Sequence, residues 1–151
     1  MDVMKDYNVY GSKNYFQKNY QKPKEIIFLD PEPDYLEELK SNENSQNKNL
    51  VYCSNVSEFI VKYLKHQNKI KCLVINAYHI PELIERSIIH GLSEVPIVVT
   101  HSKSLPENFK KNLSFRDRVF YVHKKFGIRP LLSKVSKEAK QFLSETNQYF
   151  S

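Results

Sequence analysis

The sequence is poor in the residues that mark the simplest functional classes. Its 151 residues include only three glycines, Gly11, Gly91 and Gly127, and no two of them are close enough to form a glycine-rich phosphate loop. This scarcity argues against dinucleotide binding and NTP hydrolysis. The sequence also lacks a G-x-S-x-G motif, so hydrolase chemistry has no support. The two cysteines, Cys53 and Cys72, lie inside apolar runs without zinc-finger spacing, and we interpret them as small buried hydrophobic residues.

Long hydrophobic runs are also absent. No apolar stretch approaches the roughly 20 residues that span a bilayer, and the N-terminus has no apolar signal-peptide core. We therefore expect a cytoplasmic protein with no membrane partner. With 40% hydrophobic and 26% charged residues, the chain is long enough to bury the core of one globular domain.

Positive charge is in excess and unevenly distributed. The formal net charge is +6, and residues 103–140 contain 11 Lys and Arg against 3 Asp and Glu, a local excess of 11 − 3 = +8. Such a segment suits nucleic acid, acidic lipid or an acidic protein. Charge alone specifies no partner, and we interpret it first as a solvated basic face.

The chain divides into two parts by pattern. Residues 1–23 show no consistent period and are interpreted as an irregular basic and aromatic arm, whereas residues 24–151 form the predicted domain. In this domain, apolar runs predict strands at 25–30, 50–54, 70–76, 95–100 and 118–123. Helical spacing and end signals predict helices within 31–41, 55–66, 81–91, 104–115 and 129–146.

Three local signals set the expected helix ends. Asn55 and Glu58 have capping-box spacing at the start of the second helix, and Ser104 and Glu107 have the same spacing in the fourth. Gly91 is expected to close the third helix in a left-handed conformation.

Apolar strands that alternate with helices predict a doubly wound α/β domain, with a five-stranded parallel sheet covered by helices on both faces. In such folds the site lies beyond the carboxyl ends of the strands. The polar residues expected at that edge are Asp30, Glu32, Tyr78, His79, Thr100, His101, His123 and Lys124, and Ala77 stands among them.

Four segments at these strand ends resemble the receiver domain of response regulators in two-component signalling. They are Asp30, the stretches LVINAYHIP and PIVVTHS, and FYVHKKF, and the resemblance covers about residues 24–145. It implies a flavodoxin-like fold. It also implies that Asp30 matches the first acid of a magnesium-binding pair and that Thr100, Tyr121 and Lys124 match the switch threonine, the switch aromatic residue and the active-site lysine.

The departures from the receiver pattern are chemically decisive. Ala77 stands at the phosphoacceptor position, and a methyl group can neither attack a phosphoryl donor nor bind a metal. A shift of one residue would place Asn76 there, which is not an acceptor either. Pro31 replaces the second acid, and Glu32, one position later, makes a poor magnesium site with Asp30. We expect no phosphorylation and no metal or cofactor. Lys124 is instead expected to form a partly exposed ion pair with Asp30.

Three functional hypotheses follow. The first is a degenerate receiver, a pseudo-receiver, that works by contact with a protein of unknown identity or with a second copy of itself. Its expected constitutive surface consists of Phe109, Lys110, Arg118, Phe120, Lys134 and Lys137. The second is nucleic-acid binding by the basic C-terminal third and the N-terminal arm. The third and weakest is a metal protein or enzyme that uses His79, His101 and His123 with Asp30 and Glu32, although solvent-facing histidines explain the same pattern.

Overall fold

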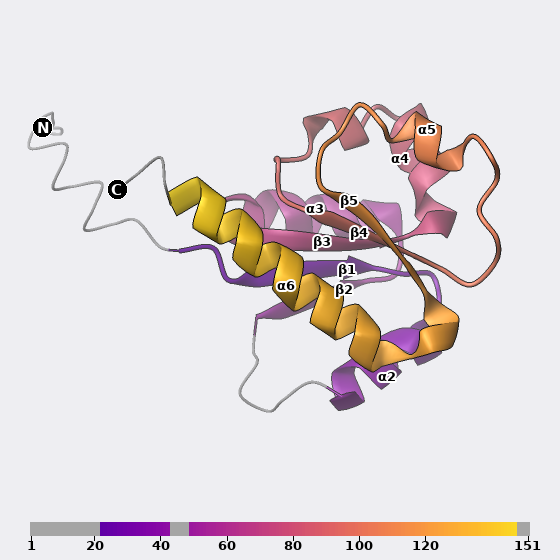
Figure 1. Cartoon of the computed structure of the whole chain (residues 1–151), viewed down its shortest axis with the longest axis horizontal. Helices are drawn as coiled ribbons and strands as arrows, with labels where there is room; N and C mark the ends of the chain where they lie inside the picture. Colours follow the sequence, from indigo (N-terminus) through magenta and orange to yellow (C-terminus); the bar gives the residue numbers. More distant parts are fainter. Residues whose placement is uncertain (1–21, 43–48, 148–151) are drawn as a thin grey trace, which may run out of the picture.

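The structure, a computed structural model, describes residues 22–42 and 49–147 (Figure 1). The expected N-terminal arm, apart from its last two residues, lies outside the described residues. The same holds for residues 43–48 and 148–151. Among the described residues, no helix is both long and apolar enough to cross a bilayer.

The expected doubly wound sheet is confirmed. Its five parallel strands lie in the order β2-β1-β3-β4-β5. They are β1 (Glu25–Leu29), β2 (Leu50–Cys53), β3 (Ile70–Asn76), β4 (Ile97–His101) and β5 (Val119–His123). Strand β4 begins two residues later than expected, after Pro96, which has no N–H to give to a ladder.

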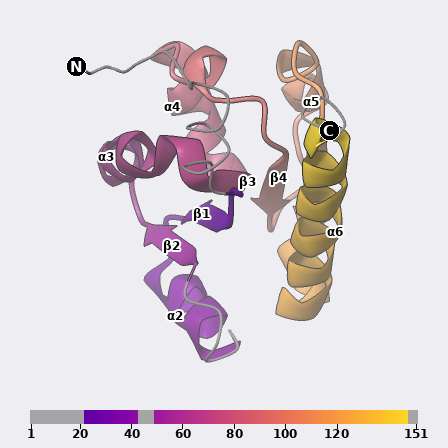
Figure 2. The same ribbon diagram turned by 90° about the vertical axis from the view of Figure 1, so that its left-hand side faces the viewer.

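Helices cover both faces of the sheet. Helices α3 (Val56–His66), α4 (Ile80–Glu85) and α5 (Phe109–Asn112) contribute to one core, and α2 (Pro33–Asn42) and α6 (Ile128–Asn147) contribute to the other. Figure 2 shows α3 and α6 on opposite sides of the strands. Strand β1 serves both cores, because Ile27 and Leu29 face the first and Ile26 and Phe28 face the second.

The third helix is shorter than the sequence predicts, and its C-cap is a different residue. Helix α4 ends at Glu85, and Ser87 rather than Gly91 takes the left-handed conformation, with φ 58°. The Ile88 N–H donates to the Leu83 carbonyl and the Ser87 N–H donates to that of Ile84, which is the hydrogen-bond pattern of a Schellman motif. Gly91 belongs to a separate 3₁₀ turn, Ile89–Gly91.

The two expected capping boxes have opposite outcomes. At α3, the Glu58 N–H donates to Asn55 Oδ1 at 2.8 Å. The Glu58 carboxylate accepts in return from the N–H of Ser54, the residue before Asn55, at 2.8 Å. This capping box is therefore confirmed, with its return bond displaced by one residue. The expected box at Ser104 is wrong. Helix α5 begins only at Phe109, after Asn108, and has no side-chain cap.

Candidate functional site

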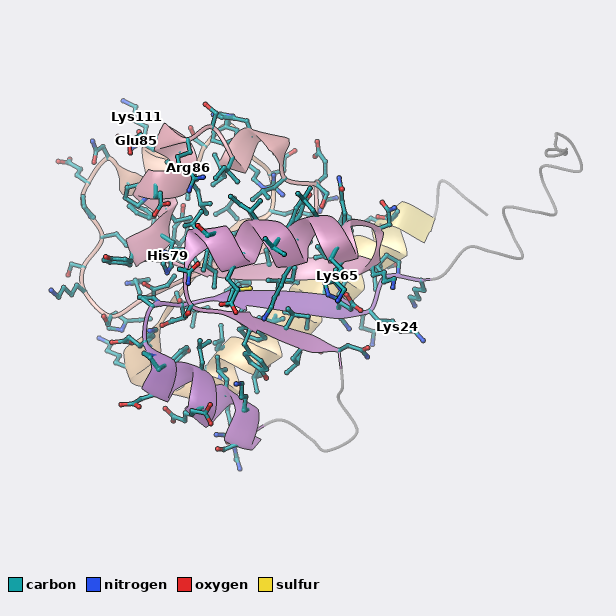
Figure 3. The ribbon with its side chains drawn as sticks, turned by 180° about the vertical axis from the view of Figure 1, so that it is seen from behind. Lys24, Lys65, His79, Glu85, Arg86 and Lys111 are labelled. Carbon is teal, nitrogen blue, oxygen red and sulfur yellow. The ribbon has the colours of Figure 1, made fainter. Side chains whose placement is uncertain are left out.

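The carboxyl ends of β1, β3, β4 and β5 meet at one edge of the sheet, as the sequence predicts. The register pairs Asn76 with Thr100 and His101 with His123, so the polar residues that end neighbouring strands lie side by side. Figure 3 shows His79 at this edge. Strand ends of this kind are where doubly wound folds place their sites.

Lys124 forms the centre of a charge cluster. Its Nζ lies 2.8 Å from Asp30 Oδ2 and 2.6 Å from Glu32 Oε1, and the Tyr35 ring lies 4.0 Å from the same nitrogen. The side chains of Lys124 and Asp30 are only 9% and 4% exposed, so the expectation of a partly exposed pair is wrong. The sequence reasoning missed Tyr35, whose ring in the first turn of α2 covers the ammonium.

The Asp30 carboxylate is held by its own loop as well as by Lys124. The Glu32 N–H donates to Asp30 Oδ1 at 2.9 Å, which fixes the turn that leaves β1. Burial nevertheless raises the pKa of Asp30, and the opposing effects of Lys124 and of the Glu32 N–H do not cancel it. The charged form of Asp30 is therefore stabilised by few groups other than Lys124, and removal of the lysine would leave a buried charge.

At the ends of β3 and β4 the side chains are neutral. Asn76 Nδ2 donates to Thr100 Oγ1 at 3.1 Å, and the Tyr78 N–H donates to Asn76 Oδ1 at 3.0 Å. Both Asn76 and Thr100 are buried, whereas Ala77 is half-buried against the core. Whichever of residues 76 and 77 is aligned with the receiver acceptor, no carboxylate stands there.

An open cleft of about 390 Å³ lies above Ala77. Its walls come from the ends of β1, β3 and β4, from the loop before α5, and from Lys124, and they are mostly apolar. Lining residues include Pro31, Glu32, Asn76, Ala77, Tyr78, Pro81, His101, Lys103, Leu105, Pro106 and Phe109. The sequence reasoning missed the part contributed by Leu105 and Pro106, because it placed a helix across residues 104–115.

The three histidines do not form one cluster. His101 Nδ1 lies 2.9 Å from the Lys103 carbonyl, so it carries the proton there, whereas His123 Nδ1 accepts the Lys125 N–H at 3.1 Å. The ring centroids of His101 and His123 are 4.8 Å apart. His79 is buried rather than solvent-facing, and neither of its nitrogens has a hydrogen-bond partner. The described part of the chain contains no group of three or more His, Cys, Asp or Glu side chains placed to hold a metal.

The switch pair of the receiver resemblance is not brought together. The register pairs Tyr121 with Val99 and Thr100 with Val122, so the Thr100 and Tyr121 side chains project to opposite faces of the sheet. Tyr121 instead lies under Lys110, whose Nζ is 4.7 Å from the ring centroid.

The expected partner surface surrounds β5, the edge strand. Its residues differ in how exposed they are and in whether they already pair with other side chains. Phe109 is buried at 8% exposure and belongs to the core, so its expected place on the surface is wrong. Lys134 lies over the Phe120 ring at 4.5 Å and pairs with the buried Glu138 at 2.8 Å. Lys137 is exposed.

Arg118 is held by α6. Its guanidinium pairs with Glu145 and lies 5.3 Å from the Phe142 ring centroid. Its backbone is left-handed, with φ 58°, at the residue that precedes β5. Such a conformation is costly for a non-glycine residue, and the contacts with α6 offset part of that cost.

Comparisons with known proteins identify the fold but no close relative. No protein-family model and no curated protein sequence matches the chain. A response regulator receiver modulated diguanylate cyclase from Pelobacter carbinolicus is similar over 82% of this chain and 98% of that one, at 19% identity and TM-score 0.59. A response regulator receiver domain protein from Bacillus halodurans is similar over 78% and 97%, at 15% identity and TM-score 0.58. The chain therefore has the fold of receiver domains.

Proposed function

We propose that this chain is a pseudo-receiver, a signalling domain that works through contact with another protein and is not phosphorylated. The observation that carries the proposal is Ala77 at the carboxyl end of β3, at the centre of the edge where the fold places its chemistry. Neither Ala77 nor the neighbouring Asn76 supplies a carboxylate to accept a phosphoryl group.

The charge cluster supports the same proposal. Glu32 and Asp30 both contact the Lys124 ammonium, so a tethered cation occupies the space between the two carboxylates that a magnesium ion would need. Pro31 contributes no side-chain oxygen, and hard cations require several oxygen ligands. The lysine thus acts as a structural counter-ion at an edge without phosphotransfer chemistry.

The surface around β5 is the best candidate for partner contact. All five residues of β5 are half-buried, and an edge strand leaves backbone groups unpaired on one side. Lys110 of α5 lies against Tyr121 of β5, and Lys137 lies in α6. Both are exposed, and neither has a carboxylate partner among the described residues. An acidic protein surface, or a second copy of the chain in a suitable orientation, fits this arrangement.

Nucleic-acid binding is the second candidate, because of the local charge excess in residues 103–140. Several of these charged side chains are bound to other groups of the same chain. The Arg116 guanidinium donates to the carbonyls of residues 92, 93 and 95, and Arg118, Lys124 and Lys134 form ion pairs. This pairing reduces the field available for phosphate contacts and favours the protein partner.

Partner capture with matched variants tests the proposal. Lys110→Glu combined with Lys137→Glu should abolish capture of the cognate protein and change the free energy of unfolding by about 0.5 kcal/mol or less, because both positions are exposed. Lys134 is unsuitable for this test, since a glutamate there would face Glu138. Lys24→Glu combined with Lys65→Glu, at the far end of the sheet, is the control (Figure 3).

Two results would overturn the assignment. If capture survives the Lys110 and Lys137 reversals but is lost on deletion of residues 1–23, the contact surface is the arm. If the protein instead shifts nucleic acid with a steep salt dependence that the same reversals remove, the second candidate is correct.

A further inference from the structure

We propose that the cleft above Ala77 binds a small planar aromatic acid, a flat ring that carries one anionic group. The inference rests on the proposed function in one respect: the cleft is free because no phosphoryl chemistry takes place there. Its volume of about 390 Å³ lies within the range of about 300–1,000 Å³ that is usual for small-molecule sites.

The walls of the cleft select a flat apolar ring. Ala77 contributes a methyl group to the lining, which also includes Leu105 and Pro106 from the loop before α5. Tyr78 lines the same cleft with a side chain that is 73% exposed. A large aromatic side chain this exposed gains contact area when an apolar ring packs against it.

The charges around the cleft select an anion. Glu32 and Lys124 both line it and pair at 2.6 Å, and the same ammonium also pairs with Asp30. Lys103 is the other charged lining residue, and it is exposed with no carboxylate partner among the residues the structure describes. Its unpaired ammonium is the group in the lining that a carboxylate or sulfonate of a ligand complements.

A buried amide provides a directional contact. Asn76 lines the cleft and is only 7% exposed. One N–H of its Nδ2 donates to Thr100 Oγ1, and its Oδ1 accepts the Tyr78 N–H. No contact within the described residues uses its second N–H. A ligand acceptor atom that reaches this N–H gains a hydrogen bond.

An NMR titration of the full chain with three probes tests this site. The probes are 2-naphthoate, the neutral 2-naphthalenemethanol, which has the same ring, and acetate, which has the charge without the ring. We expect 2-naphthoate to shift the amides of Ala77, Tyr78 and Leu105 saturably. The neutral analogue should bind the same residues about fivefold more weakly, and acetate should not saturate.

Variants separate the contributions of ring and charge. Lys103→Gln should weaken 2-naphthoate binding by about fivefold and leave 2-naphthalenemethanol unaffected. Tyr78→Ala should weaken both probes and leave the fold unchanged, because the side chain is exposed. Lys65→Gln, at the opposite end of α3 from His79, should change neither (Figure 3).

The inference is overturned if 2-naphthoate leaves these amides unshifted, or if its shifts map instead to the exposed Val61 and Leu64 of α3. It is also overturned if Lys103→Gln weakens both probes equally, because the cation would then have no electrostatic role. If 2-naphthoate does not bind the wild-type protein while partner capture is intact, this site is refuted and the proposed function stands.

Discussion

The two halves of the carboxyl edge differ in how they use polar atoms. On the side of β1 and β5, the Lys124 ammonium lies within hydrogen-bond distance of the Asp30 and Glu32 carboxylates and against the Tyr35 ring. On the side of β3 and β4, Asn76 and Thr100 form one neutral hydrogen bond beside an open cleft. The charged half is a pair of ion pairs around one ammonium, the neutral half is a single hydrogen bond, and residues of both halves line the cleft.

The largest effect is expected from loss of the central ammonium. Lys124→Met should lower the free energy of unfolding by about 3 kcal/mol near neutral pH, because it leaves the buried Asp30 carboxylate without its cation. Urea denaturation measures the change. The matched control is Lys125→Met, an exposed lysine on the next residue, which should change stability by about 0.5 kcal/mol or less. Equal effects of the two variants would show that the cluster is not a structural unit.

A smaller effect is expected in the neutral half. Thr100→Val keeps the side-chain shape but removes the oxygen that accepts from Asn76, so it should cost about 1 to 2 kcal/mol. Ser102→Ala, in the exposed turn after β4, is the control and should be neutral within about 0.5 kcal/mol. If Thr100→Val costs as much as Lys124→Met, the two halves do not differ in the way described above.

His79 should make the edge sensitive to acid. Burial lowers the pKa of His79, against the opposing effect of Asp30 and Glu82, so the folded protein favours the neutral imidazole. The stability that this provides is complete above the unfolded pKa and is lost as pH falls through the lowered folded pKa.

His79→Leu removes this titration. The free energy of unfolding of the variant, relative to that of the wild type, should therefore rise as the pH falls from about 7 to about 5. Urea denaturation across that range measures the difference, which we expect to reach about 1 kcal/mol. The exposed His90→Leu is the control. A pH-independent difference for His79→Leu would mean that the His79 ring has the same pKa in the folded and unfolded states.

The smallest effect is expected from magnesium. Millimolar Mg²⁺ should leave the melting temperature of the wild-type protein unchanged, because Lys124 lies between the two acids. Pro31→Asp combined with Ala77→Asp restores two carboxylates, and this variant should gain a Mg²⁺-dependent rise in melting temperature. A comparable rise in the wild-type protein would show that the charged half can exchange its lysine for a metal ion.

The sequence predicts the sheet and the edge residues well, because apolar runs and their spacing follow from burial. The positions of Asp30, Ala77, Thr100 and Lys124 at the strand ends depend only on that pattern. The burial of the Lys124 ammonium could not be predicted, since it depends on Tyr35 in the following helix. Burial of His79 depends likewise on how its short turn packs against α4 and β4.

The errors lie where local signals compete with tertiary packing. Gly91 is a good C-cap by residue type, yet Ser87 takes that role because the hydrogen bonds of Ile88 and Ser87 close α4 one turn earlier. Ser104 and Glu107 have capping-box spacing, but Pro106 and Leu105 line the cleft instead of entering a helix. The space above Ala77 results from this shortened helix and is invisible in the sequence pattern.

The measurement that tests the central claim most directly is incubation of the full chain with acetyl phosphate and Mg²⁺, followed by intact mass spectrometry. The wild-type protein should gain no phosphoryl group, because neither Ala77 nor Asn76 offers a carboxylate at the end of β3. The Pro31→Asp and Ala77→Asp double variant, which restores an acceptor and an acid, should gain one hydroxylamine-labile group. A hydroxylamine-labile adduct on any edge residue of the wild-type protein would contradict the account.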